Sequence, residues 1–343
     1  MLSKSSTIKG IFFTSIFIPL ENKNIKTIGT IILPITLAGS LNNSIVSFLA
    51  IPLLLLITFS YFPAVELFFL SVADWDGFLD AGEFLVGLPN QAAFVGLDNY
   101  VDLLNEPEEL KPLLVSLYYF VGAVVQLALS LWFAVLVNTK LIGRNLFKTF
   151  LFLPFVLNAV AASMVFQIFY QVQGGLDSFL SLLGCDSFFT VVENGVEVVK
   201  YPEWLANPQI VNWALVAASV WRYLGFNLIL FYGVLQSIPQ DQYEAARIEG
   251  ATEWQQFRFI TLPSIKMILG LQALLAFVGS LSVFDIPYII TKGANGTRTF
   301  VMETIRVAFE HNGYGIASAM AVILLILVVF FMIVQKLLFK EEK

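Results

Sequence analysis

Apolar residues follow one another along the chain in six long stretches, and shorter polar segments separate them. The stretches cover about 45–71, 113–137, 148–171, 209–236, 264–289 and 316–338. A helix of about 20 apolar residues crosses the hydrocarbon core of a bilayer. A backbone surrounded by lipid must form its hydrogen bonds within one element, which favours helices. The pattern therefore predicts an all-α, polytopic membrane protein with a six-helix core.

The first 45 residues do not fit this pattern, because their apolar runs IKGIFFTSIFIPL and IGTIILPITLAG are too short to span comfortably. We predict interfacial helices on the cytoplasmic face, and an extra span or an inserted hairpin are the alternatives. Lysines precede the first run as in a signal peptide, but no small-residue cleavage site follows it. The predicted organisation is an N-terminal extension (1–45), a transmembrane domain (46–338) with a polar loop (237–263), and a cytoplasmic tail (339–343).

The composition supports the membrane assignment. Hydrophobic residues make up 58% of the chain and charged residues 13%, where soluble proteins carry about 25% charged residues. The mean hydropathy is +0.80. A single cysteine, Cys185, excludes an intramolecular disulfide and a thiolate metal cluster. With one histidine, His311, we predict no metal site and no histidine proton relay.

The distribution of charge predicts the orientation. The linkers 72–111 and 172–208 hold nine and five acidic residues against only Lys111 and Lys200. Basic residues instead lie at both termini and in the segment 139–147, which has no acidic residue. Because basic residues mark the cytoplasmic side, both termini and the loop 237–263 are predicted to face the cytoplasm. The linker 290–315 does not fit this charge distribution, because it is predicted to lie outside and yet contains Lys292, Arg298 and Arg306.

The polar loop contains the run EAARIEGATEWQQFRFITLP at 244–263. Asp241 with Glu244 has the spacing of a capping box, and so has Thr252 with Gln255. Glycine at 250 supplies the left-handed residue that ends a helix, and an apolar stripe of Trp254, Phe257 and Ile260 follows it. A Glu244–Arg247 pair at i, i+3 is expected to support the first helix. The spacing predicts helix–Gly–helix, and leaves open whether the loop is a connector or a docking element.

This loop resembles the signature loop of binding-protein-dependent ABC importer permeases, whose pattern is E-A-A, three residues, Gly, and a distal Leu-Pro. The matching residues are Glu244, Ala245, Ala246, Gly250, Ala251, Phe257, Leu262 and Pro263. The chain departs from the pattern at Glu249, where Asp is usual, and keeps the charge. The runs FVGLDNYVDLL, FLPFVLNAV, SVWRYLGFNLILFYGVLQSIP, FDIPYIIT and GYGIASAMAV resemble the sugar-uptake branch, the maltose- and glycerol-phosphate-type permeases. The resemblance covers residues 46–338.

The resemblance implies that the loop is a coupling helix held in a cleft of a cytoplasmic ATPase subunit, with Glu244 and Gly250 as its anchors. It also implies four kinds of partner: a homologous second permease, two ATPase subunits, an extracytoplasmic solute-binding protein and membrane lipid, but no nucleic acid. The chain has no G-x-x-x-x-G-K-[ST] phosphate loop. We therefore predict no catalytic residues and no cofactor on this chain, with ATP and Mg bound by the partner ATPase.

Polar residues inside the apolar stretches are candidates for the substrate pathway. Arg222 lies mid-span, where the insertion of an arginine into the membrane costs about 2.5–3.5 kcal/mol. We expect its side chain to face either the substrate or the backbone carbonyls and subunits beside it. It lies deeper than Asp285 by roughly 14 Å, which disfavours a direct pair. The flanks Tyr223, Phe226, Asn227 and Gly279, Ser280, Val283 would suit a sugar, although close helix packing is the alternative. In family members that hold substrate within the membrane, contacts come from these two helices. Asn158 and Asp285 are further candidates.

The predicted function is that of a permease subunit of an ATP-driven importer in the cytoplasmic (inner) membrane of a bacterium or archaeon. It translocates a sugar or sugar-like solute, compatible solutes included. The alternatives are the same importer class for a polyamine, amino acid or anion, and a secondary transporter driven by an ion gradient. The last predicts inverted repeats, broken helices or several intramembrane carboxylates, and the strongest carboxylate candidates are only Glu66 and Asp285, both toward the outer surface.

Overall fold

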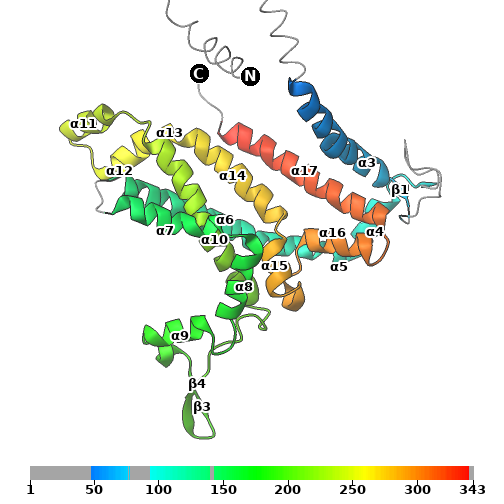
Figure 1. Cartoon of the computed structure of the whole chain (residues 1–343), viewed down its shortest axis with the longest axis horizontal. Coiled ribbons are helices and arrows are strands. Elements are labelled where there is room, and N and C mark those ends of the chain that lie inside the picture. The colour runs from blue at the N-terminus through cyan, green and yellow to red at the C-terminus, as the bar shows by residue number, and fades with distance from the viewer. Residues whose placement is uncertain (1–47, 76, 78–92, 140–142, 340–343) are drawn as a thin grey trace, which may run out of the picture. The chain divides into compact units, whose positions relative to one another are not determined.

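The computed structural model describes residues 48–75, 77, 93–139 and 143–339 (Figure 1). The expectations for residues 1–45, and for all of the tail except Phe339, lie outside the described residues. The chain divides into two compact units, residues 1–65 and 66–343. In the first unit the described residues, 48–65, are helical and include a π-helical turn, η1 (Ile57–Tyr61). Helix α3 (Phe62–Leu70) completes this first apolar helix.

Within the described residues, five helical segments are long and apolar enough to cross a membrane: Phe48–Leu70, Pro107–Asn138, Val211–Leu235, Lys266–Ile290 and Tyr314–Leu338. A sixth crossing is counted if the bent pair α7 (Arg144–Val156) and α8 (Ala159–Phe169) forms one span. The all-α, multi-span fold predicted from the sequence is thus confirmed. The other span helices are α6 (Pro112–Asn138), α10 (Val211–Leu235), α14 (Lys266–Leu281) with α15 (Asp285–Ile290), and α17 (Tyr314–Leu338).

The third predicted span, 148–171, is not one continuous helix. Its two halves, α7 and α8, meet at an angle of 98°. Pro154 lies inside the last turn of α7, where a proline cannot donate a backbone hydrogen bond. Leu157 then adopts an extended conformation, and Asn158 caps α8 by accepting a hydrogen bond from the Val160 amide at 2.8 Å. The continuous apolar run concealed this break.

Helix α10 is central to the second unit, because it packs against α6, α7 and α14. Its buried residues Leu228, Phe231 and Leu235 share a core cluster with Leu127 of α6 and Ile265. The contact with α7 is unusually close at Gly225. A Cβ there would lie 2.7 Å from Cα of Phe152 and closer still to the carbonyl of Leu151. Glycine at this position therefore sets the distance between α7 and α10.

Short elements surround the N-terminal end of α17. Strand β1 (Ala73–Asp74) pairs antiparallel with β2 (Ala93–Phe94), and they are followed by α4 (Asp98–Asn105) and α5 (Pro107–Leu110). The buried Asn99 side chain donates to the carbonyls of Ser71 and Ala73, at 3.1 and 2.9 Å. A turn η4 (Ala294–Gly296) and α16 (Phe300–Phe309) connect α15 to α17. This group of elements is called the α16 end of the unit below.

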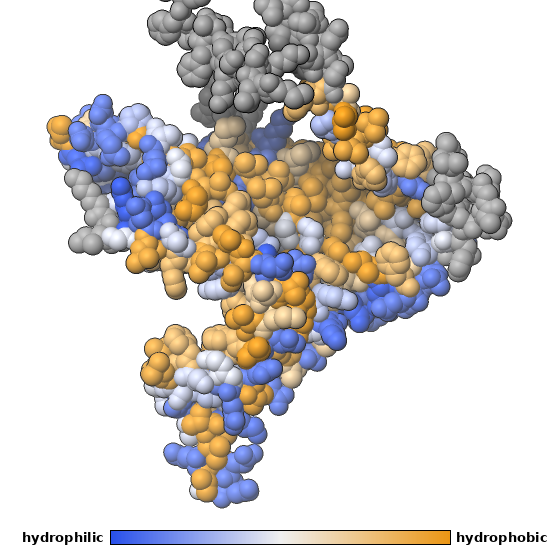
Figure 2. Space-filling model, viewed as in Figure 1, coloured by the Kyte–Doolittle hydropathy of each residue, from blue (hydrophilic) through white to orange (hydrophobic). Residues whose placement is uncertain are grey.

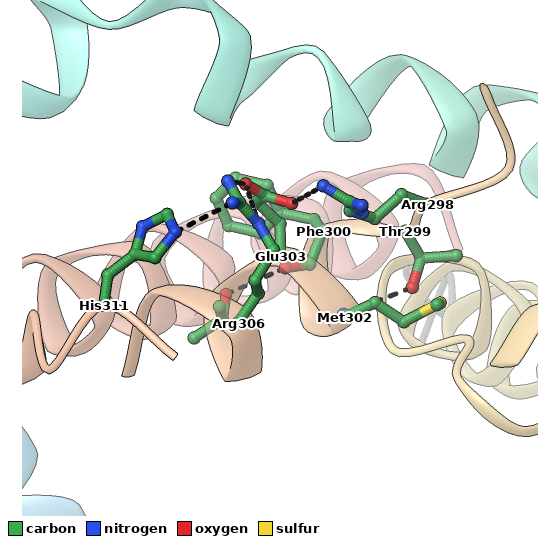
Figure 3. A network of polar contacts seen from close by, with 8 residues as sticks. Arg298, Thr299, Phe300, Met302, Glu303, Arg306 and His311 are labelled. Atoms are coloured by element: carbon green, nitrogen blue, oxygen red, sulfur yellow. Dashed lines mark hydrogen bonds and ion pairs between the residues drawn. The ribbon is translucent and has the colours of Figure 1, made fainter. Parts of the chain in front are cut away.

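A network of charged side chains around the buried Glu303 stabilises α16 (Figure 3). The Glu303 side chain is 3% exposed and accepts hydrogen bonds from Arg298 Nη1 at 3.2 Å and Arg306 Nε at 3.0 Å. Arg306 Nη2 forms a second contact with the same carboxylate, and the hydrogen bond to Glu303 raises the pKa of Arg306. Arg306 Nη1 also lies 3.0 Å from Nε2 of His311. Two of the three basic residues that did not fit the charge pattern are therefore partnered by a buried acid.

The segment 172–208 forms an arm that the sequence did not predict (Figure 1). It contains α9 (Gly175–Leu182), η2 (Cys185–Phe188) and a hairpin of β3 (Thr190–Glu193) and β4 (Val196–Val199). Asn194 and Gly195 turn the hairpin with φ of 53° and 79°, the conformation that Asn-Gly favours in tight hairpins. Buried Asp177 accepts from Trp204 Nε1 and from the Gln173 amide, both at 2.7 Å.

Candidate functional site: a polar loop and a membrane cavity

The polar loop folds as helix–Gly–helix, as the sequence predicted. Helix α11 (Gln240–Ile248) ends before Gly250, whose φ is +82°. Helix α12 (Glu253–Gln256) follows and continues through the π-helical turn η3 (Phe257–Thr261) into α13 (Leu262–Ser264). The predicted capping box is present at the start of α12, where Thr252 and Gln255 bond to each other's backbone amides. The glycine and the cap together separate two short, well-defined helices.

Two details of the loop differ from the prediction. The residue before α11 is Pro239, so Asp241 lies within the first turn and forms no capping box with Glu244. The Asp241 carboxylate still lies where the helix dipole favours a negative charge. Glu244 and Arg247 form no ion pair in the described part of the chain, and both side chains are exposed. Glu244 is therefore not committed to a partner on its own helix.

The loop is anchored on one side and exposed on the other. The hydroxyls of Tyr243 and Thr261 lie 2.9 Å apart, and Ile260 and Leu262 pack against the core cluster around Ile265. Facing outward are Glu244 and Ala245, together with apolar side chains that a monomeric surface rarely shows: Ile248 (87% exposed), Trp254 and Phe259. Figure 2 shows the loop as a hydrophilic region beside the apolar surface of the spans. The exposed face is suited to contact with another protein.

A cavity of about 550 Å³ lies among α6, α10, α14 and the segment that leads into α15. Eight of the nine candidate pathway residues line it: Arg222, Tyr223, Phe226, Asn227, Gly279, Ser280, Val283 and Asp285. Asn158 does not, because its side chain caps α8. Helix α6 forms a wall that the sequence analysis missed, with Tyr119, Gly122, Ala123 and Gln126. Gln272 of α14 was also missed.

The polar groups of the cavity are arranged in layers along the span. Toward the α16 end lies Asp285, the first residue of α15. Arg222 lies beside Tyr223, with its guanidinium carbon 5.1 Å from the ring centroid and Nη1 donating to the hydroxyl at 3.2 Å. Arg222 and Asp285 form no ion pair among the described residues, although both line the cavity. Deeper in the span, Gln272 Nε2 donates to Asn227 Oδ1 at 3.0 Å.

The aromatic residues of the cavity are partly engaged by protein neighbours. Phe226 stacks on Phe155, with ring centroids 4.5 Å apart and planes at 21°. Tyr223 lies 5.9 Å from the same ring. A single positive and a single negative side chain are present in the lining, along with amides, hydroxyls and apolar groups. This mixture is typical of a small-molecule site, where apolar walls are combined with few polar groups.

No group of three histidine, cysteine, aspartate or glutamate residues that could hold a metal is found in the described ranges. The lining of the cavity supplies hydrogen-bonding groups and aromatic rings.

Together the apolar spans, the cavity and the exposed loop define a multi-pass membrane protein of the transport-permease class. The chain belongs to the family described as binding-protein-dependent transport system inner membrane component, whose model matches residues 126–341. The family predicted from the sequence is thereby confirmed.

Individual relatives extend the match to most of the chain. The probable ABC transporter permease protein YurN of Bacillus subtilis is 30% identical over 308 residues, which cover 88% of this chain and 98% of the relative. The trehalose/maltose transport system permease protein MalF of Thermococcus litoralis is 33% identical over 244 residues, covering 70% and 78%. A crystal structure of a bacterial ABC transporter for the import of alginate includes a chain with the same fold, with a TM-score of 0.67 at 18% identity. That match covers 87% of this chain and 96% of the other.

Proposed function

We propose that this chain is one permease subunit of an ATP-driven importer and carries a sugar or sugar-like solute through the cavity. The observation that carries the proposal is the lining of the cavity: rings, amides and hydroxyls around about 550 Å³, within the usual size range of ligand sites. A sugar offers C–H faces that pack on apolar walls and hydroxyls that bond to amides. The trehalose/maltose permease among the relatives favours this class of solute.

The exposed face of the polar loop is the proposed contact with the ATPase. Glu244, Ala245 and Ile248 are exposed on α11, and Gly250 gives the bend that presents them. Two ATPase subunits, which bind ATP and Mg, would receive this loop and the equivalent loop of a second, homologous permease. Closure of the ATPases on ATP pushes the loops and opens the cavity to the outside, and hydrolysis resets it.

The proposed orientation places the polar loop in the cytoplasm and the α16 end outside. It rests on the basic segment 139–147 on one side and on the acidic linkers 72–111 and 172–208 on the other. An external solute-binding protein would deliver the solute at the α16 end, where Asp285 lines the cavity. The family description names binding-protein-dependent transport, which supports this partner.

The test is ATP hydrolysis by the reconstituted complex: this chain with its second permease, ATPase and binding protein in liposomes. Maltose, trehalose and lactose are added in turn. We expect one sugar to stimulate hydrolysis, and Glu244→Ala and Gly250→Pro to abolish the stimulation or to release the ATPase. Glu253→Ala is the matched control, because Glu253 lies on α12 outside the matched loop pattern. If the loop variants behave like the parent, the loop is only a connector; uptake driven by an ion gradient without ATP would then replace the proposal.

A further inference from the structure

Three amide side chains from three different helices line the deeper part of the cavity. They are Gln126 of α6, Asn227 of α10 and Gln272 of α14, and they are 8%, 7% and 2% exposed. Each lies well inside an apolar helix rather than at its end. Amides so far from bulk water cost free energy unless they are hydrogen-bonded. Their presence together therefore calls for a partner.

The protein satisfies only part of this hydrogen-bonding capacity. Gln272 donates to Asn227 through one N–H, and each amide has two donors and an acceptor oxygen. Gln126 has no hydrogen-bond partner among the described residues, and its side-chain atoms are not enclosed by protein. Since Gln126 lines the cavity, its free amide opens onto that space. Asn227 and Gln272 are therefore hydrogen-bonded to each other, whereas the Gln126 amide has no protein partner among the described residues.

The wall of α6 extends this pattern. Tyr119, Gly122, Ala123 and Gln126 lie at i, i+3, i+4 and i+7, which is one face of a helix. Tyr119 is 4% exposed, and its hydroxyl has no partner in the described structure. Between the two polar residues, Gly122 allows α6 to pack closely on α10, because a Cβ there would overlap Cγ1 of Val216. The Tyr119 hydroxyl is enclosed by protein, so Gln126 is the polar group that this face of α6 presents to the cavity.

We propose that Gln126, with Asn227 and Gln272, forms the inner end of the solute site and selects an uncharged, hydroxyl-rich solute over one that carries a carboxylate or phosphate. This inference rests on the proposed transport of a sugar-like solute and adds a specificity-determining residue on α6. An amide both donates and accepts, as a hydroxyl does, so the two match. A carboxylate accepts only, and would give no donor to the amide oxygens of Gln126 and Gln272, whereas the Asn227 oxygen already accepts from Gln272.

The charged residues of the cavity support the same selection. Among the described lining residues Arg222 is the one cation; Tyr223 contacts it through its ring and its hydroxyl, and its Nε is buried without a partner. Asp285 places a negative charge at the α16 end of the cavity, where it repels an entering anion. An acidic sugar would therefore meet this repulsion before it reached Arg222.

The test uses the reconstituted complex with maltose, trehalose and lactose as neutral probes and trigalacturonate as the anionic probe. The variant Gln126→Met keeps the length of the side chain and removes the amide; Gln126→Asn keeps an amide at a shorter reach. Ser116→Ala is the matched control, because Ser116 is also buried and unpartnered on α6 but does not line the cavity. Assembly is followed by copurification of the ATPase. Removing an unpartnered amide from an apolar helix should leave assembly intact.

We expect Gln126→Met to raise the KM for the transported neutral sugar about fivefold, the loss of one neutral hydrogen bond, with the maximal rate largely kept. Gln126→Asn should lie between, and Ser116→Ala should match the parent. The inference is overturned if Gln126→Met also matches the parent, or if trigalacturonate is carried as well as the neutral sugar. If the parent complex responds to none of the neutral probes, the proposed sugar transport fails instead, and the two failures are distinct.

Discussion

The contact between α7 and α10 at Gly225 yields a sharp prediction. The perturbation is Gly225→Ala, which adds a single methyl group facing the backbone of α7. The new Cβ would lie 2.7 Å from Cα of Phe152, more than half an ångström inside ordinary contact. Backbone cannot relax by changing rotamer, so the two helices must separate. The matched control is Gly233→Ala on the same helix, where an added Cβ meets no atom within 4 Å.

The magnitudes separate the two variants clearly. Overpacking costs about 1–3 kcal/mol. Because the new methyl group would contact rigid backbone, we expect an overpacking cost of about 3 kcal/mol for Gly225→Ala. Replacing glycine by alanine within a helix returns about 1 kcal/mol. We therefore expect Gly225→Ala to lose about 2 kcal/mol net and Gly233→Ala to gain about 1 kcal/mol. At about 2–4 °C per kcal/mol for a domain of this size, their Tm values should differ by about 6–12 °C.

The assay is thermal unfolding of the purified chain in detergent, followed by intrinsic tryptophan fluorescence. Six tryptophans provide the signal, and Trp221 lies one turn from Gly225 on α10. Equal Tm values for the two variants would refute the argument, because they would show that α7 and α10 do not meet closely at Gly225. A loss in both variants would refute it too, since alanine at Gly233 touches nothing.

Three further predictions concern other polar contacts. Glu303→Gln should cost about 2–3 kcal/mol by thermal unfolding, less than a fully enclosed ion pair because Arg298 is 43% exposed; equal stability at Glu303→Gln would contradict the network. Asn158→Ala should cost about 1 kcal/mol by removing the cap of α8, while Asn158→Ser, which keeps an uncharged capping oxygen, should be nearly neutral, and the same melting experiment compares them. The hydrogen bond to Asp186 raises the pKa of Tyr201 from 10.0 to about 12. Asp186→Asn should return the pKa toward 10, measured by tyrosinate absorbance. Because the folded pKa is the higher one, the stabilisation is complete below about pH 10 and is lost as the pH rises through about 12.

The spans and the loop could be predicted from the sequence because their signals are local. Long apolar runs determine membrane helices, and Gly250 with the Thr252–Gln255 pair marks the division of the loop. The break between α7 and α8 was not predicted, because the apolar run around it is long enough for one span and Pro154 and Asn158 do not by themselves fix where a helix turns. The hairpin of the arm was not predicted but could have been, because Asn194–Gly195 between two valine-rich runs is a strong turn signal.

The cavity shows the same division between local and tertiary information. Polar residues at helical spacing on α10 and α14 identified two of its walls. The α6 wall was missed because Gln126 is a lone amide in an apolar stretch, and its meaning depends on Asn227 and Gln272, which are far away along the chain. Asn158 was misplaced for the opposite reason: a polar residue in an apolar run suggested a lining group, whereas α7 ends at Val156 and the Asn158 side chain caps α8.

The bend at Leu157–Asn158 divides one span into two helices, α7 and α8, which have different main packing partners. On one side α7 packs on α10; on the other, α8 packs on α15, and Gln167 donates to the Ile290 carbonyl at 3.2 Å. Only the extended backbone of Leu157 and Asn158 joins the two helices. Both α8 and α15 also pack on α10, where Tyr170, Ile286 and Ile290 share a core cluster with Leu215 and Val216. Because Asp285, the first residue of α15, lines the cavity, the bend lets one span support both the far side of α10 and the cavity entrance at the α16 end.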